Sequence, residues 1–224
     1  MSKAIEAFVF DAYGTLFDVN SVVRKAEALF EGKGPALSET WRLKQLEYSW
    51  LRTLMGRYED FASVTSDALD WSLESLGLQA DAHTLRSLLD EYRRLAPFPE
   101  VPPSLAELSG SLELAILSNG HPDMLRAVVE HNDLARYFRG GLLSVHAVRG
   151  YKPDPRVYRL AEERLGRDRR RVGFVSSNGW DAAGAKAFGF RTYWVNRTGA
   201  PVERLGVRPD ETVADLTELT RLVA

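Results

Sequence analysis

The sequence predicts an α/β protein with an open, parallel, Rossmann-like sheet and an inserted all-helical cap. Two observations predict the sheet: short runs that are apolar throughout recur along the chain, and segments with helical periodicity separate the later runs. Runs without polar alternation are typical of strands buried on both faces, as in parallel sheets. A third observation predicts the cap, because the interval 19–97 contains only helical patterns and interrupts the alternation.

Five segments rich in Val, Ile, Leu and Phe are the predicted strands, and each ends in polar residues or glycine. They are IEAFVF (5–10), LELAILS (112–118), GLLSV (141–145), VGFVSS (172–177) and TYWVN (192–196). Helical patterns lie between the later strands, over residues 121–131, 155–165 and 180–188. This alternation indicates a doubly wound core, in which ligands bind beyond the carboxyl ends of the strands.

The interval between the first two strands has the pattern of four helices. They are expected over residues 21–31, 38–61, 63–78 and 80–95, with Ser38 or Ser63 as N-caps. Four prolines between residues 97 and 103 cannot continue a helix and mark the return to the core. We therefore expect a core domain of residues 1–18 and 98–224, and a helical cap domain of residues 19–97.

Composition and charge exclude several classes of function. The 224 residues carry a net charge of −2 and no Lys/Arg-rich run, so electrostatics favour neither nucleic acid nor an acidic membrane surface as partner. The chain has no cysteine, which excludes disulfides, thiolate catalysis and cysteine-ligated zinc, and fits a cytoplasmic protein. The segment MSKAIEAFVFD does not have the pattern of a signal peptide, and no apolar run approaches the length of a membrane helix.

Polar residues follow the first two predicted strands. Asp11 ends the first strand and Thr15 follows across a turn that contains glycine. This pair is either a nucleophilic carboxylate with a hydrogen-bond partner or an ordinary Asp-turn-Gly loop. Ser118, Asn119 and Gly120 end the second strand before a helix, where free N–H groups and a hydroxyl can bind an anion, although Asn-Gly is also ordinary turn chemistry.

Two later strands are followed by similar polar groups. Lys152 precedes Asp154, a natural N-cap, and Tyr158 lies one turn into the helix that follows. Ser176 and Asn178 end the strand at 172–177, and Asp181 falls in the first turn of the next helix, where the helix dipole favours an anion. Each of these signals is weak alone, but four in this order at strand ends indicate one site.

Together these residues resemble the L-2-haloacid dehalogenases of the haloacid dehalogenase superfamily, over essentially the whole chain. Asp11, Thr15, Ser118, Lys152 and Asp181 match the superfamily. The motifs that match the dehalogenases are DAYGTLFD (11–18), WRLKQLEY (41–48), SNG (118–120), YKPDPRVY (151–158) and SSNGWDA (176–182).

The resemblance implies hydrolysis of short L-2-haloacids to D-2-hydroxy acids and halide, in two steps. Asp11 attacks C2 of the substrate, inverts the carbon and forms an ester, which water then cleaves at the carbonyl carbon of Asp11. Lys152 neutralises Asp11, and Asp181 activates the water. The resemblance assigns the remaining catalytic roles to Thr15, Arg42, Ser118, Tyr158, Ser176 and Asn178.

The resemblance also implies a binding site for the substrate and the departing halide. Ser118, Asn119 and the turn at Ala12 and Tyr13 hold the carboxylate. Thr15 and Tyr158 orient the nucleophile and Lys152. Arg42 of the cap takes up the halide with Asn119 and Trp180, although without the resemblance it is one of many helix arginines. The apolar wall around the carbon chain is expected from Tyr13, Leu46, Phe61 and Trp180.

The residue at position 13 separates two reactions. A phosphohydrolase protonates an alkoxide and screens phosphate with magnesium, which requires an acid at position 13 and an acidic pair near 177–181. Here Tyr13 and the single acid of SSNGWD are present. Halide leaves as a stable anion and needs no general acid, so we expect neither a metal nor another cofactor.

Other functions remain as alternatives. A phosphohydrolase of the same superfamily is the first, and a catalytically silent binding protein is the second. A serine hydrolase is excluded because GFVSSNG lacks the spacing of the nucleophile elbow, and the histidines do not pair with carboxylates at metal spacing. The segment 38–58 has more apolar residues than one buried stripe requires, which predicts a homodimer through the cap helices.

Overall fold

The computed structural model of the protein describes residues 4–223. Its sheet has six parallel strands in the order β3-β2-β1-β4-β5-β6, which confirms the predicted fold class. The strands are β1 (Ala7–Phe10), β2 (Glu113–Ser118), β3 (Gly141–Ser144), β4 (Val172–Ser176), β5 (Arg191–Val195) and β6 (Glu211–Val213). The strand β1 lies between β2 and β4, so the residue that follows it is at the centre of the sheet edge.

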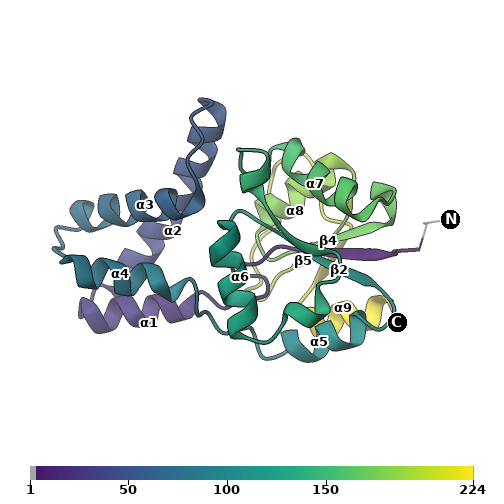
Figure 1. Ribbon diagram of the computed structural model, residues 1–224, viewed down its shortest axis with the longest axis horizontal. Helices are drawn as coiled ribbons and strands as arrows, with labels where there is room; N and C mark the ends of the chain where they lie inside the picture. The colour runs from purple at the N-terminus through teal and green to yellow at the C-terminus, as the bar shows by residue number, and fades with distance from the viewer. Residues whose placement is uncertain (1–3, 224) are drawn as a thin grey trace.

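Helices cover both faces of this sheet, as Figure 1 shows, with α7 and α8 on one side and α5 and α9 on the other. The helices of this part of the chain are α5 (Val101–Leu108), α6 (Pro122–His131), α7 (Pro155–Leu165), α8 (Gly179–Phe188) and α9 (Leu216–Val223). Because both faces are covered, every residue of β1 and β4 is buried. This burial explains why these strands are apolar throughout instead of alternating.

The sheet interior requires one glycine for close packing. A Cβ on Gly173 of β4 would lie 2.2 Å from the ring of Phe8, so only glycine leaves room for that ring. Phe8 in turn meets the edge of Tyr193 on β5, with the ring centroids 5.3 Å apart. Aromatic side chains of β1 and β5 therefore pack against each other across Gly173 of β4, which lies between these strands.

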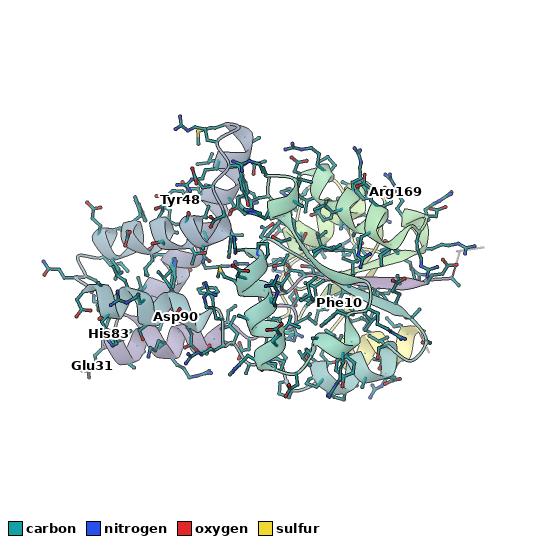
Figure 2. The ribbon with its side chains drawn as sticks, viewed as in Figure 1. Phe10, Glu31, Tyr48, His83, Asp90 and Arg169 are labelled. Carbon is teal, nitrogen blue, oxygen red and sulfur yellow. The ribbon has the colours of Figure 1, made fainter. Side chains whose placement is uncertain are left out.

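Four further helices lie between β1 and α5, and Figure 1 shows them grouped beyond one end of the sheet. They are α1 (Asn20–Leu29), α2 (Gly34–Leu54), α3 (Phe61–Ser75) and α4 (Ala82–Glu91). Figure 2 labels Glu31, Tyr48, His83 and Asp90 in this helical group and Phe10 in the sheet. The predicted division into domains at residues 18/19 and 97/98 stays a prediction.

The expected helix starts were wrong in this region. Helix α2 begins at Gly34, with proline in its first turn, and not at Ser38, and it ends at Leu54 and not at residue 61. Helix α3 begins at Phe61, because the Asp60 carboxylate accepts the N–H groups of Ala62 and Ser63 at 2.9 and 3.0 Å. An aspartate N-cap outside the apolar pattern thus determines the boundary that was assigned to Ser63.

The helices α5 and α9 and the strand β6 were not predicted. Helix α5 begins within the proline-rich stretch, which is possible because the missing N–H of proline is not needed in a first turn. The expected helix starts at Asp154 and Pro155 were confirmed, since the Asp154 side chain accepts the N–H of Arg156 at 2.9 Å.

Candidate active site

The predicted polar residues converge at the carboxyl edge of the sheet. Phe10, labelled within the sheet in Figure 2, is the last residue of β1, and Asp11 follows it. The Asp11 N–H donates to the carbonyl of Val175 on β4 at 2.9 Å, so the backbone stays attached to the sheet at this point. The fold therefore holds the Asp11 side chain in a fixed place between the loops that follow β2 and β4.

Asp11 is 7% exposed, and three side chains donate hydrogen bonds to its carboxylate. The Thr15 hydroxyl and the Asn178 amide donate to Oδ2 at 3.0 and 2.9 Å. The Lys152 ammonium donates to Oδ1 at 3.0 Å. Donors on both oxygens orient the carboxylate and offset the cost of burying its charge.

Lys152 is fully buried and joins two carboxylates. Its Nζ lies 3.0 Å from Asp11 and 2.9 Å from Oδ2 of Asp181. Burial alone would lower the pKa of Lys152, but the two neighbouring carboxylates raise it, and the net pKa is above its usual value. The lysine therefore stays a cation and neutralises part of the charge of the pair.

Asp181 lies on the far side of this ammonium and has no exposed surface. Its Oδ1 accepts the hydroxyl of Tyr158 at 2.7 Å. Burial raises the pKa of Asp181, the Lys152 cation opposes this rise, and the nearby Asp11 carboxylate adds to it, so the net pKa is raised. Asp181 is thus suited to accept a proton.

Tyr158 has a different partner from the expected one, which was Lys152. Its hydroxyl contacts Asp181, with a 2.7 Å bond to the carboxylate and a 3.3 Å bond to the backbone carbonyl. Burial, and then the charge of Asp181, raise the pKa of Tyr158 well above its usual value, so the phenol stays protonated. Tyr158 is therefore a fixed hydrogen-bond donor to Asp181, and its position relative to Lys152 follows from that contact.

Ser176 is the last residue of β4, and Asn178 lies in the loop that follows it. The Ser176 hydroxyl accepts the N–H of Asn178 at 3.1 Å, and this bond shapes the turn into α8. The Asn178 side chain then contacts Asp11 and accepts a 3.4 Å hydrogen bond from Arg42. The Asn178 amide therefore lies between Asp11 and Arg42 of α2, while its backbone carbonyl accepts the N–H of Asp181 at 3.0 Å.

Arg42 belongs to α2 and is half-buried, and its guanidinium reaches Asn178 from a position 136 residues earlier in the chain. Its expected companions, Asn119 and Trp180, have other partners. The Asn119 carbonyl oxygen accepts the N–H of Lys152 at 3.1 Å, and Trp180 meets the edge of Trp50 at 5.4 Å. Arg42 is therefore a cation that the cap presents to the core, and not a solvated surface charge.

The loop after β2 forms a tight corner. Ser118 is fully buried, and its hydroxyl accepts the N–H of Gly120 at 3.0 Å. A Cβ on Gly120 would lie 2.8 Å from the ring of Tyr13, so glycine is required here. The corner brings Ser118 against the turn at Ala12 and Tyr13, where a substrate carboxylate was expected.

Aromatic rings from core and cap meet beside Asp11. Tyr13 is 3% exposed, stacks on Phe61 at 6.2 Å and meets the edge of Tyr92 at 5.9 Å. Its hydroxyl is buried and has no hydrogen-bond partner within residues 4–223. Burial raises the pKa of Tyr13, so this group is a neutral part of an apolar wall. Leu46, also expected in the wall, is half-buried on α2.

Two residues that contact the site were missed in the sequence. Trp50 of α2 donates its indole N–H to the Lys152 carbonyl at 3.1 Å, and with Trp180 it lines a cavity of about 740 Å³. The helical pattern of the sequence does not distinguish Trp50 from a tryptophan that only packs in the interior. Arg197 binds the loop after β1 through the carbonyls of Gly14 and Thr15 at 3.2 and 2.9 Å. A signal for Arg197 was present, since it follows the strand ending at Val195 as the other site residues follow theirs.

The arrangement of these groups determines which chemistry the site can perform. A carboxylate with oriented oxygens lies beside an apolar wall and a cation, and a second carboxylate, with a raised pKa, contacts the same lysine. Among the described residues, no group of three or more His, Asp or Glu side chains could hold a metal ion. In the same part of the chain, no helix is long and apolar enough to cross a membrane.

Comparisons with known proteins agree with this geometry. The family model for haloacid dehalogenase-like hydrolases matches residues 5–189. The (S)-2-haloacid dehalogenase of Pseudomonas sp. (strain YL) is 53% identical, over 97% of this chain and 94% of its own.

Two solved structures extend this similarity to the fold. The L-2-haloacid dehalogenase RSc1362 is 46% identical over 99% of both chains, with a TM-score of 0.96. That of Xanthobacter autotrophicus with chloropropionic acid covalently bound is 46% identical over 98% of both chains, with a TM-score of 0.91. The chain therefore belongs to the haloacid dehalogenase-like hydrolases, among the L-2-haloacid dehalogenases.

Proposed function

We propose that the protein hydrolyses short L-2-haloacids to D-2-hydroxy acids and halide through an ester on Asp11, with inversion at C2. The observation that carries this proposal is the buried row Asp11–Lys152–Asp181, in which one ammonium lies within 3.0 Å of two carboxylates. The covalent chloropropionic acid in the Xanthobacter autotrophicus relative supports an intermediate of this kind. The reaction consumes one water and yields hydroxy acid, halide and one proton.

In the first step an Asp11 oxygen forms a bond to C2 while the carbon–halogen bond breaks. Thr15, Asn178 and Lys152 hold the carboxylate in one orientation, so little motion is needed to reach the transition state. Halide gains its charge only as the bond breaks, and Arg42 supplies a cation on the cap side. Tyr13 and Phe61, with Leu46 and Trp180, exclude water from the carbon chain.

The substrate carboxylate binds at the corner after β2 in this proposal. The Ser118 hydroxyl and the N–H groups of Asn119 and of the turn at Ala12 and Tyr13 form the cradle. Its support is the tight approach of Tyr13 to Gly120, which brings the two loops together beside Asp11. The orientation of this cradle selects the L-substrate, because only one enantiomer then presents C2 to Asp11 with the halogen toward Arg42.

In the second step water attacks the ester carbonyl carbon of Asp11, and the bond from that carbon to the substrate oxygen breaks. Asp181 takes one proton of the water, for which its raised pKa suits it, and returns it to the leaving hydroxyl oxygen. The second proton of the water is released when Asp11 returns to a carboxylate. The oxyanion develops on the Asp11 oxygen that is not bonded to C2, where the donor is Lys152 if that oxygen is Oδ1, and Thr15 and Asn178 if it is Oδ2. Tyr158 holds Asp181 in place. Ser176 shapes the turn that carries Asn178.

The alternatives have less support. A phosphohydrolase requires an acid at position 13, and Tyr13 fills that position with its ring packed between Phe61 and Tyr92. A silent binding protein does not require three donors on one carboxylate. Halide release from both enantiomers of 2-chloropropionate, measured beside phosphatase activity, separates these functions. We expect halide from the L-enantiomer and no phosphate release.

A single turnover in oxygen-18 water tests the covalent step. If Asp11 attacks carbon, the first product carries unlabelled oxygen from Asp11, and label enters the peptide that contains Asp11. The peptide that contains Asp181 is an internal control and should stay unlabelled. Labelled product together with an unlabelled Asp11 peptide would show that water attacks C2 directly and would refute the ester.

We also propose a homodimer formed through the cap helices. Its support is the exposure of apolar residues on α2 and at its C-cap: Leu43 is 59%, Leu54 83% and Met55 61% exposed. A cytoplasmic location remains an inference from the cysteine-free sequence. Sedimentation of the protein and of a variant with Leu54→Glu tests the dimer, because a charge within a packed apolar contact should separate the copies.

A further inference from the structure

Arg197 lies just beyond β5, and its side chain is only 17% exposed. It is outside the row of Asp11, Lys152 and Asp181, yet its guanidinium donates to three separate segments. The first is the loop after β1, where Nη1 donates to the carbonyl of Gly14 at 3.2 Å and Nη2 to that of Thr15 at 2.9 Å. Gly14 has a φ of +85°, so this loop depends on an unusual backbone conformation.

The second segment is the loop after β4. Nη1 of Arg197 donates to the Ser177 hydroxyl at 2.8 Å, and the Ser177 N–H donates to the Thr15 hydroxyl oxygen at 2.8 Å. The two loops are thus joined directly and through the guanidinium. Thr15 and Asn178, which supply two of the three donors on Asp11, are each within one residue of these bonds.

The third segment is the return from the cap. Glu100, at the start of α5, accepts from Nη2 and Nε of Arg197 at 2.7 and 3.1 Å. The guanidinium also lies 3.8 Å from the ring centre of Phe98. Phe98 in turn donates its N–H to the carbonyl of Leu16 at 3.1 Å. The Arg197 guanidinium therefore contacts both chain segments that join the sheet to the helical group, which are the loop after β1 and the segment before α5.

We propose that Arg197 is a positioning residue, which holds the loop after β1 against the loop after β4 and thereby sets Thr15 and Asn178 on the Asp11 carboxylate. It acts on the reaction through those two donors and does not touch the substrate. A lysine has one point charge and cannot satisfy the carbonyls, Ser177 and Glu100 together. The inference rests on the proposed function, because its main effect is on the step in which Asp11 forms the ester.

Loss of this contact should therefore slow turnover without weakening substrate binding. Displacing a reacting group by about 1 Å costs on the order of 100-fold in rate. We expect Arg197→Ala to lower kcat per folded molecule by tenfold to about 100-fold, with KM within about threefold of the wild type. Arg197→Lys should recover part of kcat, and Ser177→Ala, which removes one of the bonds, should lower it by a smaller factor.

Arg191 is a matched control. It lies at the other end of β5 and pairs with Glu211 at 3.5 Å, with the Arg191 side chain 33% exposed. Arg191→Ala removes a partly buried guanidinium from the same strand, but it should leave kcat unchanged. Unfolding curves give the folded fraction of each variant, so a loss of stability is separated from a loss of turnover.

The test combines steady-state kinetics with mass spectrometry of the Asp11 ester in the first turnover. A lower kcat and a slower rise of the ester in Arg197→Ala, with partial recovery in Arg197→Lys and no effect in Arg191→Ala, support the inference. A kcat per folded molecule within about twofold of wild type in Arg197→Ala and Ser177→Ala overturns it. If Arg197→Ala does not fold, Arg197→Lys and Ser177→Ala decide. Absence of halide release from the wild type would instead refute the proposed function.

Discussion

Replacing Lys152 by methionine removes the cation between Asp11 and Asp181 and keeps a side chain of similar length. Both contacts are short, at 3.0 and 2.9 Å, and the lysine and Asp181 side chains have no exposed surface. Removing one partner of a buried ion pair leaves an uncompensated charge and costs about 3–5 kcal/mol. We expect a loss of stability of this size at about pH 8, together with loss of halide release.

The sign of the pH dependence follows from the two carboxyl groups. In the wild type, the raised pKa of Lys152 contributes stability that is present below its unfolded pKa and is lost only as the pH rises through the folded pKa. In the variant, no cation opposes the rise in the pKa of Asp181 that burial and the Asp11 carboxylate cause. The destabilisation is then present above the raised pKa of Asp181 and disappears as this group binds a proton at lower pH. The difference between variant and wild type should therefore shrink between about pH 8 and about pH 5.

Denaturant unfolding followed by tryptophan fluorescence at both pH values measures this difference. Adding Asp181→Asn to the variant should restore part of the stability, because one of the uncompensated charges is removed. Lys186→Met is the matched control, since its pair with Asp210 has side chains that are 35% and 29% exposed. It should cost less than about 1 kcal/mol at either pH. A loss below about 1 kcal/mol in Lys152→Met at pH 8, or one that does not change with pH, would refute the reasoning.

Four further outcomes are expected. Arg42→Ala should lower kcat on the order of 100-fold, whereas Arg52→Ala, which removes an exposed pair with Asp67, should change it by less than about threefold in the same halide assay. Halide release should be the same with and without EDTA, and restoration by magnesium after chelation would contradict the proposed mechanism. Tyr13→Phe should leave kcat nearly unchanged and stability equal or higher in unfolding curves, because the hydroxyl has no partner in the described residues. Burial and the Asp11 carboxylate together raise the pKa of Asp181 by more than Lys152 lowers it. As the pH is lowered, Asp181 should therefore bind a proton, and kcat should fall, at a higher pH than for an ordinary aspartate.

The strands and the reacting residues could be predicted from the sequence because their signals are local. A run that is apolar throughout marks a strand buried on both faces, and the residue after it must lie at the sheet edge. This rule predicts Asp11 and Ser118, at the ends of β1 and β2, as residues of the sheet edge. The strand β6 has only three residues, Glu211–Val213, and is too short and polar to give such a signal.

Helix boundaries in the cap were less predictable, because competing caps lie close together in the sequence. The segment 38–61 has the composition of one long helix, but the Asp60 carboxylate caps α3 and the chain turns before it. Propensity distinguishes poorly between Ser38, Asp60 and Ser63 as caps, since all are suitable residue types. In the folded chain Asp60 is the cap, and α2 ends before it and packs against α3 and α1.

The sequence by itself determined the parallel sheet, the positions at its edge and, through Tyr13, the choice between two chemistries. Only the tertiary structure decided which partners those positions have. Arg42 meets Asn178, Tyr158 holds Asp181, and Arg197 joins loops that are more than 160 positions apart in the chain. The physical reason is that a local pattern specifies which face of an element is buried. The contacts of a polar side chain depend on which distant loops the folded sheet brings within hydrogen-bonding distance of it.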